Sequence, residues 1–314
     1  MPIVNSKSGE IVIYSLAGFR IVSDLPLRGL TRWDRDFQAA DEIAIRRASI
    51  PESLSRVDAV FPGGQYNNNE LLLDIPNVAR YLLRDGNEIL VDQANASSHE
   101  DVCSFLLGTV FGLLSHRRGI IPLHASAIDI ADGCVAFMGE SGSGKSTLTA
   151  ALVARGHYVI ADDVCFLQPN TRFVHAWPGV NRIRLWEDAI AALGCKSPGL
   201  ERIWNGWNKF FIPGDPPQNP LESRQLHRIY QLQTASVHSL PSLERLRGAE
   251  AIDVVLQNVY RLDLAERIGL KPAVFRLCAR IAKDVSVFRF SRPKDLRFLR
   301  EGVDFLEDHL HNIH

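Results

Sequence analysis

The chain has 314 residues, of which 46% are hydrophobic and 23% charged, so its composition is that of an ordinary globular protein and excludes a disordered or fibrous one. Its 35 basic and 36 acidic residues leave a formal net charge of −1, so there is no overall positive field to hold nucleic acid or an anionic membrane. The length favours two domains, and small molecules or peptides are the expected partners.

The cysteines and the N-terminus predict a cytoplasmic protein. No Cys-x-x-Cys or zinc-type spacing occurs among the cysteines, which are read as reduced thiols: Cys103, Cys134, Cys165, Cys195 and Cys278. The first residues contain no basic segment followed by an apolar core, so no secretion signal is expected. The most apolar run, 102–114, is shorter than the roughly 20 residues that a bilayer-spanning helix needs and is expected to be a buried helix.

The first hundred residues predict a β-rich N-terminal domain over 1–95. Residues 10–25 read as two strands broken at Ala17-Gly18, and residues 79–92 read as a hairpin around Asp85-Gly86. The second domain is expected over 96–314.

A helix is expected to join the two domains. Ser97 or Ser98 is suited to cap its start, and acidic residues follow at 100 and 101, where a helix has its positive end. Residues 117–119, Arg-Arg-Gly, are typical of a helix end.

The middle of the chain predicts a strand–loop–helix–strand unit. Residues 120–130 and 134–138 are expected to pair as a hairpin through the turn Ala-Asp-Gly. A helix is predicted from Lys145 to Arg155 with Gly156 as its stop, followed by a buried strand in 157–164. This order indicates a βαβ unit with parallel strands and a right-handed crossover.

The remainder of the chain is less regular. Residues 195–225 are dense in Gly, Pro and Asn and are expected to form a long loop over the surface or across a site. Residues 249–269 and 272–285 have helical spacing, and 285–290 is a strand candidate.

Residues 139–146, Gly-Glu-Ser-Gly-Ser-Gly-Lys-Ser, match the P-loop pattern in full. Backbone N–H groups of such a turn surround phosphate oxygens, and the following helix adds its positive end. The expected nucleotide-binding residues are Gly139, Glu140, Ser141, Gly142, Ser143, Gly144, Lys145, Ser146 and Thr147. Lys145 is expected to reach the β- and γ-phosphates of ATP, and Ser146 to bind Mg²⁺; the structural alternative is a tight turn that matches by chance.

Asp162 and Asp163 end the strand after the predicted P-loop helix, only 16 positions beyond Ser146. That location is the carboxyl edge of the sheet, beside the nucleotide. Because side chains alternate along a strand, the two carboxylates are expected to point apart unless the chain bends, with one holding metal and the other facing an acceptor hydroxyl. In isolation, such a pair is as well explained as a solvated strand end.

His124 is expected in the strand that pairs with the P-loop strand. A lone histidine in an apolar run is more often a hydrogen-bonded core residue than a catalytic one. A strand neighbour of the P-loop strand, however, brings an imidazole close to the aspartates, where it orients a carboxylate or shifts its pKa.

Residues 123–164 resemble the catalytic core of the HPr serine kinase/phosphorylase family, with a His before the P-loop strand, the P-loop, then Arg-Gly-His and Ala-Asp-Asp. The resemblance implies an α/β fold with a P-loop core like the C-terminal domain of HPr kinases. It also implies that Asp162 acts as base toward a seryl hydroxyl with help from His124. Ser146 and Asp163 are the predicted metal-binding residues, although the choice between the two aspartates as metal ligand stays open. Flanking segments resemble HPr-kinase-related proteins, including kinases of lasso-peptide precursors.

The chain departs from that family after the aspartate pair. The family's Glu-x-Arg-Gly signature is replaced by residues 176–186, which lack both its glutamate and its Arg-Gly. The phosphorylase reaction is therefore not implied. Arg182 and Arg184 are candidates for contacting phosphate or acceptor, with surface arginines as the alternative, and Lys209 is a weaker candidate that also reads as a solvated loop residue.

The predicted function is transfer of the γ-phosphoryl group of ATP, with Mg²⁺, to a serine of a small protein or peptide, such as a lasso-peptide precursor. A homo-oligomer is a further expectation, since related kinases assemble as hexamers. Two alternatives stay open: a non-catalytic nucleotide-binding module that regulates a partner, and an ATPase or a kinase of a small metabolite.

Overall fold

The computed structural model describes residues 10–33, 41–194, 200–202, 208–213, 219 and 221–311, and it has a mixed α/β fold with large sheets. The chain forms two compact units, Met1–Ile120 with Arg261–Val274, and Ile121–Tyr260 with Phe275–His314. These units differ from the division expected at residue 95, because the helices that follow that residue pack with the first sheet. No described helix has the length and apolar character needed to cross a membrane.

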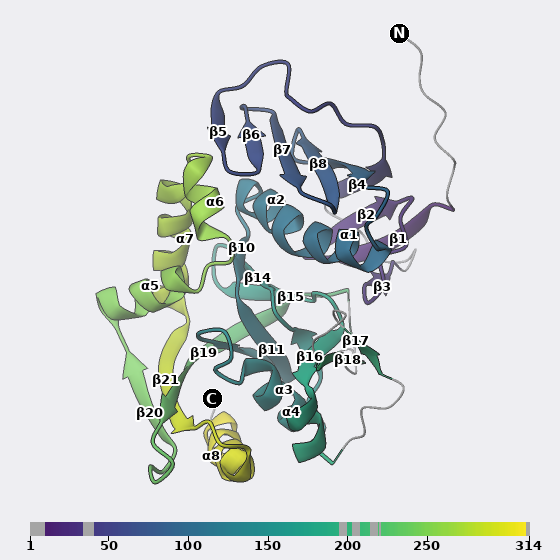
Figure 1. Ribbon diagram of the computed structural model, residues 1–314. Helices are drawn as coiled ribbons and strands as arrows, with labels where there is room; N and C mark the ends of the chain where they lie inside the picture. The colour runs from purple at the N-terminus through teal and green to yellow at the C-terminus, as the bar shows by residue number, and fades with distance from the viewer. Residues whose placement is uncertain are drawn as a thin grey trace. The chain divides into compact units, whose positions relative to one another are not determined.

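The first unit is built on a mainly antiparallel sheet (Figure 1). In spatial order its described strands are β3 (Thr31–Arg32), β1 (Val12–Leu16), β2 (Phe19–Ser23), β4 (Glu42–Arg47), β9 (Glu88–Gln93), β8 (Ala79–Arg84), β7 (Glu70–Ile75), β6 (Gly64–Tyr66) and β5 (Ala59–Phe61).

The hairpin predicted around Asp85-Gly86 is confirmed, and the two strands expected on either side of Ala17-Gly18 also pair as a hairpin. Ala17 and Gly18 have φ of 52° and 83°, and they reverse the chain between β1 and β2. Asp85 and Gly86 have φ of 49° and 71° between β8 and β9. Two successive residues with positive φ match the twist of the flanking strands, which is why these dipeptides predict hairpins.

Helical residues 99–117 lie along one face of this sheet (Figure 1). They comprise α1 (His99–Phe105), a π-helical turn (Leu106–Val110) and α2 (Phe111–Arg117), and α6 (Leu262–Arg267) contacts α2. The Ser98 side chain caps α1 by accepting a hydrogen bond from the Asp101 N–H at 3.0 Å, as expected. The Tyr81 hydroxyl of the sheet donates to the Val102 carbonyl at 2.9 Å, which fixes the helix against the strands.

The second unit contains a mixed sheet. In spatial order its described strands are β10 (Ile121–Leu123), β14 (Cys165–Pro169), β15 (Val174–Trp177), β19 (Arg224–Ala235), β12 (Gly133–Met138), β11 (Ala125–Ile130) and β13 (Val159–Ala161). Strand β21 (Ser286–Pro293) also pairs with β19, and β20 (Ser242–Leu246) pairs with β21. The predicted hairpin of β11 with β12 is confirmed. The long strand β19 has no counterpart in the sequence-based expectations.

The βαβ expectation needs one correction. Helix α3 (Lys145–Val153) does connect β12 to β13, and the two strands run in the same direction. They are not neighbours, because β11 lies between them and pairs antiparallel with both. The parallel partner of β12 is β19.

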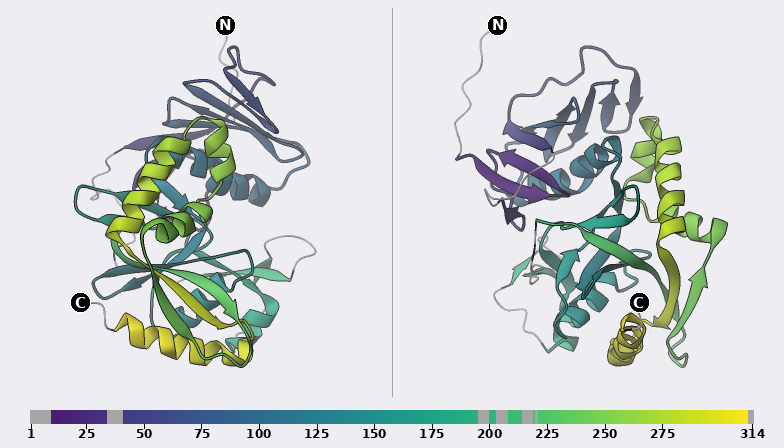
Figure 2. Two further views of the ribbon diagram at one scale, coloured as in Figure 1. Left: turned by 90° about the vertical axis from the view of Figure 1, so that its left-hand side faces the viewer. Right: turned by 180° about the vertical axis from the view of Figure 1, so that it is seen from behind.

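Helix α3 is enclosed by two apolar clusters. On one side Leu148 and Leu152 pack with the sheet and with α8 (Leu299–Leu310), which runs beside β21 (Figure 2). On another side Ala150 packs with residues of a small sheet and of α4 (Glu187–Ala192). A helix covered in this way is apolar around most of its circumference, which holds its N-terminus rigidly beside the end of β12.

The small sheet consists of β16 (Arg182–Trp186), β18 (Lys209–Pro213) and β17 (Glu201–Arg202) in the order β16-β18-β17. The expected long loop over 195–225 is therefore wrong at β18, because Phe210 buries its ring in the cluster beneath α3. Cys195 and much of that predicted loop lie outside the described residues.

The C-terminal part of the chain supplies the remaining helices. The predicted helical segment 249–269 divides into α5 (Gly248–Gln257) and α6, and the segment 272–285 corresponds to α7 (Lys271–Asp284), which ends one residue earlier. The strand expected at 285–290 is β21, which is followed by a 3₁₀ turn (Leu296–Phe298) and α8.

Candidate functional site

A glycine-rich loop, residues 139–144, joins the end of β12 to the start of α3. Gly144 has φ of 91°, and a Cβ there would lie 2.7 Å from Nη2 of Arg292. The positive φ favours glycine at this position, and the Arg292 side chain lies close to it.

Lys145, the first residue of α3, is almost entirely buried and folds back over this loop. Its Nζ donates to the carbonyls of Gly139 at 2.8 Å and Glu140 at 3.2 Å. Burial lowers the pKa of Lys145. A buried ammonium whose hydrogen-bond partners are carbonyl oxygens favours a nearby anion, because its charge is not neutralised by those partners.

Asp162 follows the last residue of β13 and is buried beneath the start of α3. Its Oδ1 accepts from Ser126 Oγ at 2.5 Å and from Ser146 Oγ at 2.9 Å, and its Oδ2 accepts from the Arg184 N–H at 2.9 Å. Burial is the largest influence on this carboxyl and raises its pKa, although the three donors act in the opposite direction. The sequence position of Ser126, two residues after His124, carries no motif that would have identified this contact.

Asp163 adopts φ of 75°, so the chain bends between the two aspartates. Its Oδ2 pairs with Arg184 Nη1 at 2.6 Å, and its Oδ1 lies 3.6 Å from His124 Nδ1. Because of the bend, both carboxylates reach the same end of the sheet with different partners. The sequence-based expectation was that the two carboxylates point apart unless the chain bends, and here the chain does bend.

The expected location of His124 is wrong in one respect. The residue lies in a break between β10 and β11, and its backbone N–H donates to the Asn258 carbonyl at 2.8 Å, so it is not part of the strand that pairs with β12. Its Nδ1 lies 3.1 Å from the Asp163 carbonyl oxygen. Burial, followed by repulsion from Lys145, lowers the pKa of His124, which favours the neutral ring.

The candidate basic residues of the small sheet have different surroundings. Arg184 faces the aspartate pair, whereas the guanidinium of Arg182 lies over the Phe211 ring, 4.8 Å from its centroid. Lys209 lies on β18 rather than in a loop, and its Nζ is 5.5 Å from the centroid of the Trp186 ring. Burial, followed by repulsion from Arg184, lowers the pKa of Lys209.

These elements surround a cavity of about 800 Å³. Its lining includes ten of the sequence candidates, namely His124, Ser141, Gly142, Gly144, Lys145, Ser146, Thr147, Asp163, Arg184 and Lys209. Gly139, Glu140, Ser143, Asp162 and Arg182 belong to the same region but do not line this cavity. Arg292 and Lys294 also line it, and no sequence signal identified them because they follow the loop by nearly 150 residues.

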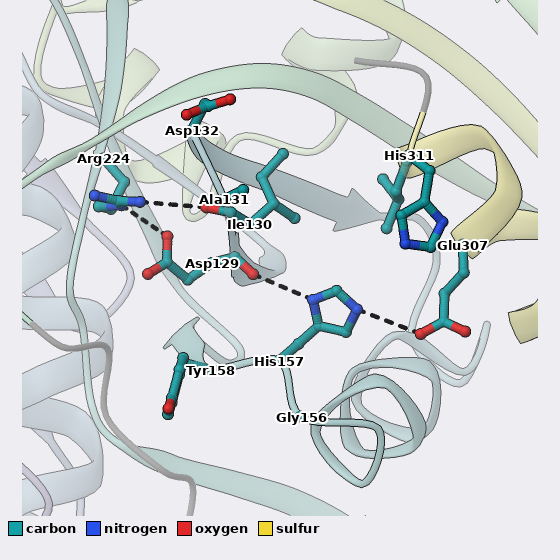
Figure 3. Close-up of a pocket in the computed structure, with 11 residues that line it drawn as sticks. Asp129, Ile130, Ala131, Asp132, Gly156, His157, Tyr158, Arg224, Glu307 and His311 are labelled. Carbon is teal, nitrogen blue, oxygen red and sulfur yellow. Dashed lines mark hydrogen bonds and ion pairs between the residues drawn. The ribbon is translucent and has the colours of Figure 1, made fainter. Parts of the chain in front are cut away.

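A second cavity, of about 530 Å³, lies at the other end of β11 and β12 (Figure 3). His157 lies between the Asp129 carbonyl oxygen and Glu307 Oε1, at 3.3 Å from each, and Arg224 Nε donates to Asp129 Oδ1 at 2.7 Å. These charged groups are satisfied by one another. The cavity beside the glycine-rich loop, where the buried Lys145 ammonium donates to loop carbonyls, is the better candidate site.

Comparison with known proteins finds similarity to HPr kinase/phosphorylases. Over 122 residues the chain is 32% identical to an HPr kinase/phosphorylase of Stenotrophomonas maltophilia, which is 36% of this chain and 38% of that protein. Over 94 residues it is 34% identical to an HPr kinase/phosphorylase of Nitrosomonas europaea, which is 29% of this chain and 26% of that protein. The chain thus spans well under half the length of these curated relatives, and no family model matches it.

A solved structure, the HPr(Ser) kinase/phosphatase of Coxiella burnetii, aligns with 61% of this chain and 97% of its own. Its TM-score is 0.32 and its sequence identity 16%, so the assignment depends on the sequence similarity. Over about a third of its length, the chain is thus similar to HPr kinase/phosphorylases.

Proposed function

We propose that the chain is a serine kinase with a P-loop core, which transfers the γ-phosphoryl group of ATP to a seryl hydroxyl of a small protein or peptide. The main support for the proposal is the hydrogen bond of 2.9 Å that Ser146 Oγ donates to Asp162 Oδ1, directly beside the loop that Lys145 covers. This hydrogen bond places the start of α3, which is proposed to bind ATP, next to a carboxylate whose pKa is raised. The similarity to HPr kinase/phosphorylases over a third of the chain supports the same reading.

The donor side of the proposed site is the glycine-rich loop with Lys145, Ser146 and Thr147. The loop amides and the N-terminus of α3 suit phosphate oxygens, and the Lys145 ammonium suits the β- and γ-phosphates. Most of the rate enhancement in phosphoryl transfer comes from positioning and from neutralising charge, which these groups supply.

The residues beside Lys145 fit a magnesium ion. Mg²⁺ prefers oxygen ligands and is usually held by one or two carboxylates together with substrate phosphates. The Ser146 hydroxyl and the Asp163 carboxylate line the cavity and offer such oxygens. When bound, the ion would neutralise phosphate charge. Among the described residues there is no cluster of three or more His, Cys, Asp or Glu side chains that could hold a metal ion.

On the acceptor side, Asp162 is proposed to take the proton of the seryl hydroxyl. The seryl oxygen then forms its bond to the γ-phosphorus as the bond to the β,γ-bridging oxygen breaks and ADP leaves. A raised pKa makes the carboxylate a better base. His124, neutral and 3.6 Å from Asp163, would orient that second carboxylate.

One contact favours the reverse assignment of the two aspartates. Ser146 bonds Asp162, whereas Asp163 is the aspartate that lines the cavity. In that case Asp162 would serve the metal and Asp163 the acceptor. The Mg²⁺ dependence of nucleotide binding separates the two: loss of the Mg²⁺ effect in Asp162→Asn, but not in Asp163→Asn, would select the reverse assignment.

The acceptor and setting are part of the proposal. We expect a peptide with an accessible serine, such as a lasso-peptide precursor, and a reaction in the cytoplasm, possible for a chain whose four described cysteines are free thiols. Assembly as a homo-oligomer is also proposed.

The alternative functions make different predictions. A regulatory nucleotide-binding module would bind ATP without any phosphorylated acceptor, and an ATPase or metabolite kinase would consume ATP without peptide.

The test is mass spectrometry of a serine-containing candidate peptide after incubation with the protein, ATP and Mg²⁺. We expect a gain of one phosphate, which is lost when the acceptor serine is replaced. Lys145→Ala and Asp162→Asn should each reduce the rate by at least a factor of about 100, since a general base typically contributes that much or more. Arg300→Ala, an exposed change on α8, is the control. Wild-type rates in Asp162→Asn would refute the role of that residue as base.

A further inference from the structure

Arg292, near the end of β21, is held against the glycine-rich loop from the distant C-terminal part of the chain. The residue is 5% exposed. A Cβ on Gly144 would lie 2.7 Å from its Nη2, and a Cβ on Gly302 of α8 would lie 3.2 Å from its Cδ. Two glycines therefore make room for this side chain, one in the loop and one in α8.

The guanidinium of Arg292 is poorly satisfied where it lies. Nη1 donates to the Pro293 carbonyl at 3.2 Å, Nη2 is 3.4 Å from the Gly144 carbonyl, and Nε is buried without a partner. None of the carboxylates in the described part of the chain forms an ion pair with it. Burial is the cause that lowers the pKa of Arg292. An arginine stays charged under physiological conditions, so the fold buries a positive charge that it does not neutralise.

Arg292 is accompanied by other cations on the same side of the cavity. The Lys145 ammonium donates to carbonyl oxygens of the loop, and Lys294 Nζ lies 3.8 Å from where a Cβ on Gly142 would be. All three residues line the cavity beside the loop. Of the carboxylates that line the cavity, Asp163 is already paired with Arg184.

We infer that Arg292 is a phosphate-binding residue of the proposed nucleotide site and that the polyphosphate of a nucleoside di- or triphosphate neutralises its buried charge. The inference depends on the nucleotide binding proposed above but not on phosphoryl transfer. A planar guanidinium with several N–H donors suits phosphate oxygens, and the unpaired Nε and the long Nη2 contact leave donor capacity for them.

This role has a consequence that an ordinary structural arginine would not have. A buried charge without a counter-ion destabilises the protein until an anion binds, and replacement of buried charges by apolar side chains is often neutral or stabilising. In Arg292→Met, the unliganded protein should therefore melt at the same or a higher temperature than wild type. The increase in Tm that nucleotide produces should shrink, because the neutralising contact is gone.

The experiment compares wild type, Arg292→Met and Arg292→Lys by calorimetric titration with ATP, ADP and pyrophosphate, and by melting with and without each. We expect at least a tenfold loss of affinity for all three in Arg292→Met and partial recovery in Arg292→Lys, which keeps the charge. Arg297→Met is the matched control, because Arg297 is exposed and already paired with Asp295. It should bind as wild type does.

Several outcomes would overturn the inference. Unchanged affinities in Arg292→Met would do so, as would a marked fall in the Tm of its unliganded form with a normal nucleotide response, since that identifies a structural arginine. A wild-type protein that binds none of the three anions would also refute it. If binding depends on Arg292 but no acceptor is ever phosphorylated, the proposed kinase function fails and the inference stands.

Discussion

Ser126 and Ser146 donate hydrogen bonds to the same carboxylate oxygen of Asp162, at 2.5 and 2.9 Å. The first hydroxyl is fully buried, while the second belongs to α3 at the cavity. Hydrogen bonds to the charged form of a carboxyl lower its pKa, so Ser126 partly offsets the effect of burial on Asp162. Ser126 is thus placed to set the pH at which Asp162 becomes ionised.

We predict that Ser126→Ala raises the pKa of Asp162 further. A net hydrogen bond to a charged group is worth about 1.5 to 3 kcal/mol, and 1.36 kcal/mol corresponds to one pKa unit. If ionised Asp162 is the base, the acidic limb of the plot of kcat against pH should move about one unit or more to higher pH. Activity well above that limb should be much less affected.

The matched control is Ser115→Ala, which removes another buried hydroxyl, bonded to the Phe111 carbonyl in the first unit. It should leave the pH profile unchanged.

The pH dependence of protein stability supplies an independent test. Because the pKa of Asp162 is raised on folding, its ionisation costs stability as the pH rises from the unfolded value through the folded one. Ser126→Ala should deepen that loss; an unaltered profile would contradict the role of Ser126.

At the scale of elements, the turn between β11 and β12 determines how closely β19 approaches. Gly133 begins β12, and a Cβ there would lie 2.4 Å from the Gln225 carbonyl oxygen and 2.6 Å from the His227 ring. The neighbouring backbone cannot move without disturbing the parallel pairing of β12 with β19. Since β12 leads into the glycine-rich loop, this pairing also positions the site.

We predict that Gly133→Ala destabilises the protein by about 1 to 3 kcal/mol, the usual cost of forcing extra volume into a packed region. Gly179→Ala is the graded comparison, because a Cβ there meets Ala161 and the Val164 carbonyl at 3.3 Å, where small adjustments relieve the contact. Urea denaturation of both variants measures the difference. Equal stabilities of the two variants would contradict the close approach at Gly133.

At the scale of the whole molecule, the two units are interleaved in the sequence. The first unit contains Met1–Ile120 and also Arg261–Val274, so the second unit is made of two separate segments. Within the first unit, helical residues 99–117 depend on the sheet: Phe111 contacts the Phe19 ring, with centroids 6.1 Å apart, and Val102 receives the Tyr81 hydrogen bond.

We therefore predict that a fragment of residues 96–314 does not fold normally. Val102, Leu106 and Phe111, which are fully buried, would lose their partners in the first sheet and expose apolar surface. The expected signs are increased binding of a hydrophobic dye and aggregation in sedimentation, with a fragment of residues 10–314 as the control. A monomeric, dye-free 96–314 fragment with native near-UV circular dichroism would instead favour a domain boundary at residue 95.

Local sequence patterns were sufficient wherever a feature depends on near neighbours. The turn at Asp85-Gly86, the Ser98 cap and the start of α3 at Lys145 follow from the conformations that Asp-Gly pairs, serine and glycine prefer. The aspartates were also located correctly at the end of a strand. For β18 the composition was misleading, because burial of Phe210 outweighed a Gly- and Pro-rich context.

The sequence by itself determined the glycine-rich loop, its helix and the aspartate pair, because each is a short-range pattern whose chemistry is carried by adjacent residues. Only the tertiary structure decided which groups meet there. The chain bends at Asp163, which brings both carboxylates to the site. The contacts of Ser126 with Asp162 and of Arg292 with Gly144 join residues separated by up to 148 positions. Such contacts depend on strand order and packing, to which a local pattern is insensitive.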